Sequence, residues 1–166
     1  RGDLTADWRE KAGIDFNKEW KSLTLQTLLS EPLANGRSVP DASKGFPVLR
    51  LTCLKNGRIN LNERKIGAWT KKEAERFFVH KDDFLVSRGN GSLSLVGRGG
   101  LVDCIPDEVA YPDTLIKIRI RHEICSPKFL SLVWNSNVIR EQVEASARTT
   151  AGIHKINQKS MKEFIL

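Results

Sequence analysis

Cysteine is scarce in this sequence of 166 residues, and long apolar runs are missing. The three cysteines, Cys53, Cys104 and Cys125, are odd in number, and no two of them form a C-x-x-C pair. Such a set argues against a disulfide framework and is typical of a reducing compartment. No apolar stretch approaches the ~20 residues that a transmembrane helix requires. We therefore expect a cytoplasmic location and no membrane partner.

Several enzyme motifs are missing as well. The sequence contains neither a G-x-G-x-x-G nor a P-loop motif, and it has no N/D-P-P-Y/F methyltransferase motif. His80, His122 and His154 are scattered, and none has the local partners of a catalytic triad. His122 and Cys125 form the nearest approach to a metal-ligand pair, but without a second pair we expect ordinary packing. The sequence thus predicts no catalytic residue, no metal site and no cofactor in this chain.

What is present suits one globular domain. The length lies within the ~100–200 residues usual for a domain. Hydrophobic residues make up 40%, charged residues make up 28%, and the mean hydropathy is −0.35, all ordinary values for a chain that forms a core. The chain begins Arg1-Gly2-Asp3, without an initiator Met or a signal sequence. We expect it to be a piece of a longer protein.

The net charge of +7 is unevenly distributed. Residues 50–98 carry eleven basic and five acidic side chains, and residues 114–166 carry nine and four. Between them, residues 99–113 carry four acidic side chains and no basic ones. Two basic blocks favour a polyanionic partner, because Lys and Arg neutralise phosphates and release counterions. A solvated basic surface is the alternative interpretation, since many proteins have one.

Turn signals and short apolar alternations predict several strands. Residues 46–54 and 58–62 are expected to form a hairpin about Asn56-Gly57, because both turn residues tolerate positive φ. Residues 32–45 are rich in Pro, Gly, Asn and Ser and are expected to form a loop. Further strands are predicted at residues 84–87, 93–102 and 114–121.

Helix signals are fewer. Thr70 and Glu73 have the spacing of a capping box, which predicts a helix over residues 71–77. Ser126 as N-cap and Pro127 at the first position predict a helix that continues to about residue 148 and is broken near residues 135–137. A short helix or turn is predicted within residues 19–30. The fold class is therefore α+β: a single domain with a small mixed or antiparallel sheet and hairpins, flanked by short helices.

Three segments carry residue types that contact nucleic acid. Arg88, Asn90 and Ser92 lie on a Gly-rich segment. Arg can recognise guanine and Asn can recognise adenine. Glycine lets the backbone come close to a phosphate. The strand over residues 114–121 alternates apolar and basic residues, so we expect an outward basic face suited to phosphates. Residues 148–155 predict a second polar loop, at a helix C-terminus. For each segment the alternative is a solvated turn or strand face.

One enzymatic alternative exists. Asp41 after Pro40, followed by Glu63 and Lys65, resembles the P-D…(D/E)-x-K pattern of restriction-type nucleases, in which two carboxylates hold Mg²⁺ and the Lys helps to activate water. The pattern is short and degenerate. Asp41 is also expected in a loop, whereas a nuclease needs this residue on a strand of the active-site sheet.

Several segments in order resemble one family, the specificity subunits of type I restriction–modification enzymes. Residues 1–10 are similar to the end of the family's helical spacer, and residues 46–59 to an early hairpin of its target recognition domains. The segment Phe84-Leu85-Val86-Ser87-Arg88-Gly89-Asn90-Gly91-Ser92, with residues 95–98, resembles the middle strand-loop-strand. Residues 129–156 resemble the closing helix and loop. Lys81-Asp82-Asp83 departs from the family's usual Gly-Asp, so we expect that turn to avoid positive φ.

The resemblance implies a role without catalysis. It implies a spacer end over residues 1–18 and a target recognition domain over residues 19–166, the second (C-terminal) one of its subunit. Such a domain recognises half of a bipartite double-stranded DNA sequence. Its partners are the methylation subunits and, through them, the restriction subunits, to which S-adenosylmethionine, ATP and Mg²⁺ would belong. The predicted DNA contacts are Arg50, Arg58, Lys65, Arg88, Asn90, Ser92, Arg98, Lys117, Arg119, Arg121, Arg148, Thr149, Thr150 and Lys155.

Overall fold

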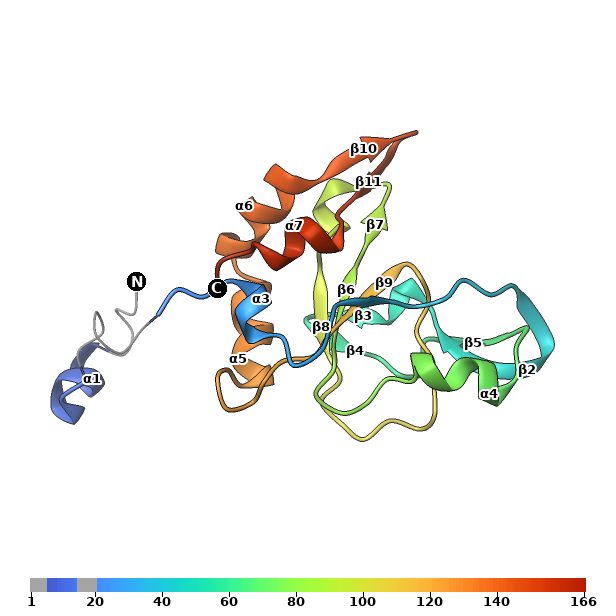
Figure 1. Cartoon of the computed structure of the whole chain (residues 1–166), viewed down its shortest axis with the longest axis horizontal. Coiled ribbons are helices and arrows are strands. Elements are labelled where there is room, and N and C mark those ends of the chain that lie inside the picture. The colour runs from blue at the N-terminus through green and yellow to red at the C-terminus, as the bar shows by residue number, and fades with distance from the viewer. Residues whose placement is uncertain (1–5, 15–20) are drawn as a thin grey trace.

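A six-stranded mixed sheet organises the part of the chain that the structure, a computed structural model, describes, namely residues 6–14 and 21–166 (Figure 1). Strands β4 and β8 run parallel, and the other neighbours in this sheet run antiparallel. In spatial order the strands are β1 (Ala34–Asn35), β9 (Leu115–Ile118), β6 (Phe84–Ser87), β8 (Gly99–Leu101), β4 (Arg58–Ile59) and β3 (Leu54–Lys55).

Two smaller sheets and short helices complete the fold. One sheet pairs β2 (Asp41–Leu49) with β5 (Arg64–Gly67), and the other has the order β10 (Arg148–Thr150), β11 (Ile153–Lys155), β7 (Gly89–Asn90). The α-helices are α1 (Ala6–Ala12), α3 (Leu25–Leu28), α4 (Lys71–Ala74), α5 (Pro127–Trp134), α6 (Asn137–Ser146) and α7 (Gln158–Lys162). The 3₁₀ turns are η2 (Leu51–Cys53), η3 (Glu75–Phe77) and η4 (Leu93–Leu95).

Alternate residues of the central strand β6 enter two separate cores, as expected for side chains that alternate across a sheet. Phe84 and Val86 belong to the core formed with α3, α5, α6 and α7. Leu85 belongs to the core formed with β2 and α4. Figure 1 shows these two groups of elements on opposite sides of the sheet. Ser87, two residues after Leu85, therefore lies on the side of the second core.

The α+β fold class expected from the sequence is confirmed, and so are the main helix signals. The predicted helix after Ser126 begins at Pro127, with the Ser126 hydroxyl accepting from Phe129 N at 3.1 Å. It is broken between Trp134 and Asn137, where the sequence predicted a break. The helix after Thr70 has its capping box, but it changes to a 3₁₀ turn at Glu75.

The Thr70 cap gives a stability prediction. Thr70→Ala should lower the free energy of unfolding by about 1 kcal/mol, because the Glu73 amide loses its acceptor. Hydrogen bonds from the Thr70 backbone and side chain lower the pKa of Glu73. The stability that Glu73 contributes is therefore present at pH values above its pKa in the unfolded chain. It is lost as pH falls through its lower pKa in the folded protein. Urea unfolding at neutral and acidic pH measures both effects; an equal loss in the two conditions would contradict the role of Glu73.

The expected hairpin about Asn56-Gly57 exists but is much shorter than predicted. Positive φ values of 51° and 76° at these two residues make the turn, and only Leu54 and Lys55 pair with Arg58 and Ile59. The predicted strand over residues 46–54 is broken by η2, and its first half pairs with β5 instead. Part of the predicted loop over residues 32–45 forms β1 and the start of β2.

Two further expectations were wrong. Asp82 has a φ of 70°, so its turn does adopt positive φ without glycine; Asp tolerates this region better than most residues. The polar loop predicted over residues 148–155 is a β-hairpin, because residues 148–150 pair with residues 153–155.

The predicted spacer segment is described only in part. Residues 1–5 and 15–18 lie outside the described residues, and α1 buries no side chain. The predicted boundary at residue 18 therefore stays a prediction. None of the helices in residues 6–14 and 21–166 combines the length and apolar character that crossing a membrane requires.

Candidate nucleic-acid interface

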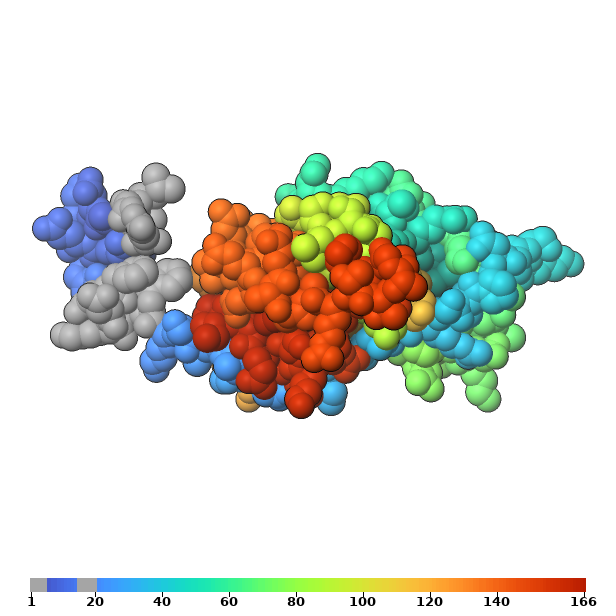
Figure 2. Space-filling model, turned by 90° about the horizontal axis from the view of Figure 1, so that it is seen from above, coloured from blue at the N-terminus to red at the C-terminus, as the bar shows by residue number. Residues whose placement is uncertain are grey.

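The sheet of β7, β11 and β10 brings together two segments that are far apart in the sequence and that were both predicted to contact DNA. His154 pairs with Asn90 on one side and with Thr149 on the other. Ala151 and Gly152, with φ of 48° and 75°, close the hairpin. The hairpin projects from the body of the fold in Figure 1, and Figure 2 shows it beside the segment that follows β7.

This three-stranded sheet is fixed to the body at its base. Arg88 N donates to Thr114 O at 2.8 Å, and Ile156 N donates to Arg88 O at 3.0 Å. The Ile156 side chain is buried in the first core. Beyond this base all three residues of β10 are exposed. The hairpin thus presents its side chains to solvent while its two ends are held in place.

The three-stranded sheet and the residue before β7 carry cations that carboxylates do not neutralise. Residues 84–102 and 145–162 contain no Asp or Glu. Arg88, Arg148 and Lys155 form no ion pair with any carboxylate in the described part of the chain. Uncompensated cations on a projecting ribbon attract phosphates at long range and neutralise them on contact.

The basic stripe predicted along residues 114–121 is not an exposed face. Lys117 is only 8% exposed, since β9 lies between β1 and β6 in the sheet and all its residues are buried. Its Nζ lies 3.1 Å from Glu31 Oε1. Arg119 forms ion pairs with Asp83 and Glu31, and Arg121 is exposed and donates to the Thr27 carbonyl. The predicted outward basic face is therefore wrong, because two of its three cations form ion pairs with carboxylates within the fold.

Three further predicted cations, Arg50, Arg58 and Lys65, are paired with carboxylates. Arg50 and Lys65 both contact the Asp41 carboxylate, and Arg58 Nη1 lies 3.2 Å from Asp103 Oδ2. These three residues belong to β2, β5 and β4 or their ends, not to the three-stranded sheet. They remain predicted contacts, but the structure does not gather them with Arg88 and Arg148.

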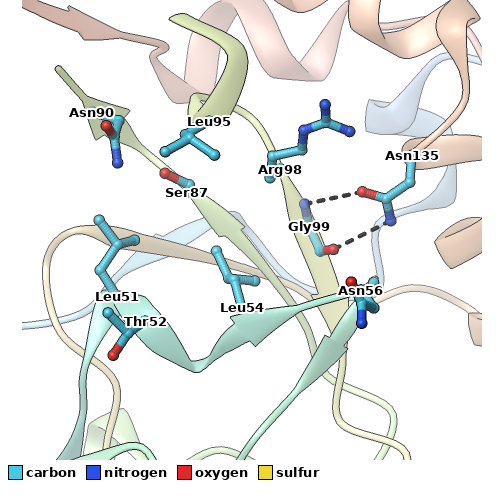
Figure 3. Close-up of a pocket in the computed structure, with 11 residues that line it drawn as sticks. Leu51, Thr52, Leu54, Asn56, Ser87, Asn90, Leu95, Arg98, Gly99 and Asn135 are labelled. Atoms are coloured by element: carbon cyan, nitrogen blue, oxygen red, sulfur yellow. Dashed lines mark hydrogen bonds between the residues drawn. The ribbon is translucent and has the colours of Figure 1, made fainter. Parts of the chain in front are cut away.

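A pocket of about 610 Å³ opens beside β7 (Figure 3). Asn90 and Arg98, two of the predicted contacts, line it together with residues that the sequence reasoning missed. The Asn56-Gly57 turn was recognised, but nothing in the sequence showed that it lies beside β8 and α5, where Gly57 O accepts from Leu101 N and Ser131 Oγ. The pocket-lining residues not predicted are Leu51, Thr52, Leu54, Asn56, Gly57, Ser87, Leu95, Gly99 and Asn135.

Arg140 on α6 was also missed. Its Nη1 donates to Val96 O at 2.7 Å, and its Nη2 donates to Leu93 O at 3.4 Å. Burial lowers the pKa of this guanidinium, while Glu144 at 2.9 Å opposes that effect. Arg140 thereby fixes the η4 turn between β7 and Arg98. The sequence did not indicate this contact, because a single Arg on a polar helix face does not show which backbone carbonyls it will bind.

The residues of the nuclease alternative do not form a metal site. Asp41 lies on β2 and not in the expected loop, but Lys65 and Arg50 occupy its carboxylate. The hydrogen bond from Lys65 lowers the Asp41 pKa, and that from Lys55 lowers the Glu63 pKa. Within the described residues no group of three or more His, Cys, Asp or Glu side chains is placed to hold a metal ion. Nothing in the structure supports the nuclease alternative.

Comparison with known proteins points to one family. No protein-family model matches the chain. The chain is 28% identical over 171 residues to the type I restriction enzyme EcoKI specificity subunit of Escherichia coli strain K12, covering 99% of this chain and 35% of that protein. It is 33% identical over 146 residues to the StySPI specificity subunit of Salmonella potsdam, covering 86% and 31%. The chain thus spans about one third of the length of these curated relatives.

Solved structures share the fold. The HsdS subunit from Thermoanaerobacter tengcongensis superposes with a TM-score of 0.60 at 16% identity, over 89% of this chain and 37% of that one. The S subunit of a type I restriction–modification system from M. genitalium gives 0.54 at 18% identity, over 92% and 35%. The fold is therefore that of part of a type I S subunit. By sequence, the chain is a homologue of type I restriction enzyme specificity subunits and corresponds to about one third of one.

Proposed function

We propose that this chain is a target recognition domain that binds one half-site of a bipartite double-stranded DNA sequence. The main observation behind this proposal is the projecting sheet of β7, β11 and β10, whose cations have no carboxylate partners among the described residues. The homology to restriction enzyme specificity subunits over nearly the whole chain supports the same conclusion.

The β10–β11 hairpin fits the major groove, which admits a two-stranded ribbon. In this arrangement Arg88 and Asn90 on the adjoining strand contact base edges, because guanidinium and amide groups form paired hydrogen bonds with guanine and adenine. Arg148 and Lys155 contact phosphates and set the register. Thr149 and Thr150 contact either, with the Thr149 hydroxyl already 2.9 Å from His154 Nδ1.

The wider role that we propose is that of a non-catalytic, cytoplasmic component. The domain, over residues 19–166, is the second of its subunit and follows a spacer end over residues 1–18. Its partners are methylation subunits and, through them, restriction subunits. S-adenosylmethionine, ATP and Mg²⁺ belong to those partners. The names of the curated relatives, which are subunits of restriction enzymes, support this placement.

A selection experiment tests the DNA-binding proposal. The chain is incubated with a randomised duplex library, bound DNA is recovered over several rounds, and the enriched sequence is used in mobility-shift titrations over a range of salt concentrations. We expect one short motif and an affinity that falls steeply with salt. If a complex with methylation subunits forms but shows no salt-dependent DNA binding, the chain is an interaction domain and the proposal is wrong. Cleavage of the duplex with Mg²⁺ would instead revive the nuclease alternative.

Arg88→Ala tests the base-contact assignment. We expect a loss of about 1–3 kcal/mol on the selected duplex and relaxed preference at one base pair, because one pair of hydrogen bonds to a base is removed. Titration against all single-base variants of the site measures both. Lys81→Ala, which removes an exposed cation near the opposite end of β6, should leave affinity and preference unchanged. If Arg88→Ala weakens binding equally to every sequence, Arg88 contacts the phosphate backbone of the DNA instead of a base.

A further inference from the structure

One buried hydroxyl in the pocket beside β7 has no partner. Ser87 is 2% exposed, and its Oγ forms no hydrogen bond in the structure. Its backbone is fully used, since Ser87 N donates to Arg98 O and Ser87 O accepts from Gly97 N. A buried polar atom without a partner costs about 1–3 kcal/mol. Such an atom on a pocket wall indicates a ligand group that completes its hydrogen bonding.

The walls on either side of this hydroxyl are apolar. Leu51 and Leu54 point towards the segment that carries Ser87 and Leu95 (Figure 3). Leu95 is 50% exposed, so a bound ligand could still cover apolar surface there. All three leucines line the same pocket. A flat ligand with apolar faces would bury them.

Two polar side chains of the pocket lining, Arg98 and Asn90, keep unused donors. Arg98 Nε donates to Ser94 O at 2.9 Å, and the terminal nitrogens of its guanidinium have no hydrogen-bond partner among the described residues. Asn90 Oδ1 accepts from Ser92 N at 3.0 Å, and its amide nitrogen has none there either. The pocket lining therefore offers donors from Arg98 and Asn90 and one buried hydroxyl from Ser87.

The walls are also held rigidly. Asn135 bridges Gly99 O at 3.2 Å and Ser131 O at 3.0 Å, and Trp134 Nε1 donates to Gly97 O at 2.8 Å. Across the pocket, Thr52 Oγ1 donates to Glu63 at 3.0 Å. The cavity is thus preformed, as small-ligand sites usually are, and its volume of about 610 Å³ suits a ligand of nucleoside size.

We propose that this pocket binds a single nucleobase. A base has two apolar faces for the leucines, a polar edge for the Ser87 hydroxyl, and an attached phosphate for Arg98. The base belongs either to a nucleotide that leaves the duplex bound at the adjoining sheet or to a free nucleotide. The first source rests on the proposed function, and the second does not.

The test compares Ser87→Ala with Ser94→Ala, using the whole chain. Ser94 supplies a matched hydroxyl, since it is exposed on η4 and outside the pocket. Ser87→Ala should unfold at the same or a higher temperature than the unchanged chain, because an unpaired hydroxyl is removed. This measurement separates binding effects from misfolding.

The duplex arm places a mispair at each position of the selected site in turn. Unpairing a base that leaves the stack removes part of the cost of extrusion, so a mispair at one position should tighten binding about tenfold. We expect Ser87→Ala to reduce that gain about fivefold and Ser94→Ala to retain it. Failure of the duplex to bind at all contradicts the proposed function, and the free-nucleotide arm then decides this inference alone.

The second arm titrates the chain with each of the four common nucleoside monophosphates by calorimetry. If a free nucleotide is the ligand, at least one should bind, and Ser87→Ala should weaken it about fivefold while Ser94→Ala does not. The nucleobase proposal is overturned if neither arm shows binding that depends on Ser87, or if the two variants behave alike.

Discussion

Replacing Arg119 by alanine is expected to lower the free energy of unfolding by about 3–5 kcal/mol. Arg119 donates from Nε to Asp83 Oδ1 at 2.7 Å and from Nη2 to Asp83 Oδ2 at 3.0 Å. Asp83 has no solvent exposure, so the substitution leaves a buried carboxylate without its cation. Urea unfolding followed by tryptophan fluorescence measures the loss.

Two further variants make this prediction specific. Arg121→Ala removes an exposed cation two residues away and should cost less than about 1 kcal/mol. Adding Asp83→Asn to Arg119→Ala should recover part of the stability, because the buried charge is removed. If the double variant is no more stable than Arg119→Ala, the loss does not come from an unpaired Asp83.

The Arg119 guanidinium keeps its charge throughout the ordinary pH range. Its hydrogen bond to Asp83 raises the pKa of the guanidinium above its usual value, against the effect of partial burial. The stability that this pKa shift provides is present at every pH below the unfolded pKa and is lost only as pH rises through the folded one. Arg119 therefore holds β9 to the turn before β6, where the sequence had suggested a phosphate contact.

Trp134→Ala is expected to lower the free energy of unfolding by about 3–5 kcal/mol as well. The indole is 2% exposed, and its ring centroid lies 5.7 Å from that of Phe84 and 6.0 Å from that of Phe164. Its removal leaves a cavity between α5 and the sheet and frees the Gly97 carbonyl. Thermal and urea unfolding measure the change.

Trp8 provides the matched control for Trp134. It is 62% exposed on α1, and Trp8→Ala should change the unfolding free energy by no more than about 0.5 kcal/mol. Trp134→Phe should lie between the two, since it keeps most of the ring packing and loses the hydrogen bond to Gly97. A loss for Trp8→Ala comparable with that for Trp134→Ala would show that α1 packs on the body.

Local signals predicted local structure well. The cap at Ser126, the box at Thr70 and the turn at Asn56-Gly57 each depend on a few neighbouring residues, and all three occur in the structure. The strand pairings were predicted less well, because they depend on residues distant in sequence. The partner of residues 46–49 is β5 and not the strand after the Asn56-Gly57 turn, which no local pattern indicates.

The candidate site shows the same division. Arg88, Asn90 and residues 148–155 were chosen from residue type and predicted loop context, and the pairing of His154 with Asn90 brings the two segments together. Lys117 is a cation of the same type as Lys155, but it is buried and paired with Glu31. Alternation along a strand predicts an exposed face only when one side of the sheet is open, and β9 is covered on both sides. Tertiary packing, which the sequence pattern does not contain, decided between the two cases.

The hairpin of residues 148–155 closes on Ala151 and Gly152, pairs with β7 along β11, and leaves β10 as the outer strand of its sheet. Every side chain of β10 is exposed, so most replacements there change stability by less than about 0.5 kcal/mol. Folding therefore places few demands on the residues of this ribbon. A library that randomises its outward positions, and keeps Gly152 for the turn, should consist mostly of folded proteins. The ribbon is accordingly the place at which a designer could change what the domain recognises without rebuilding the domain.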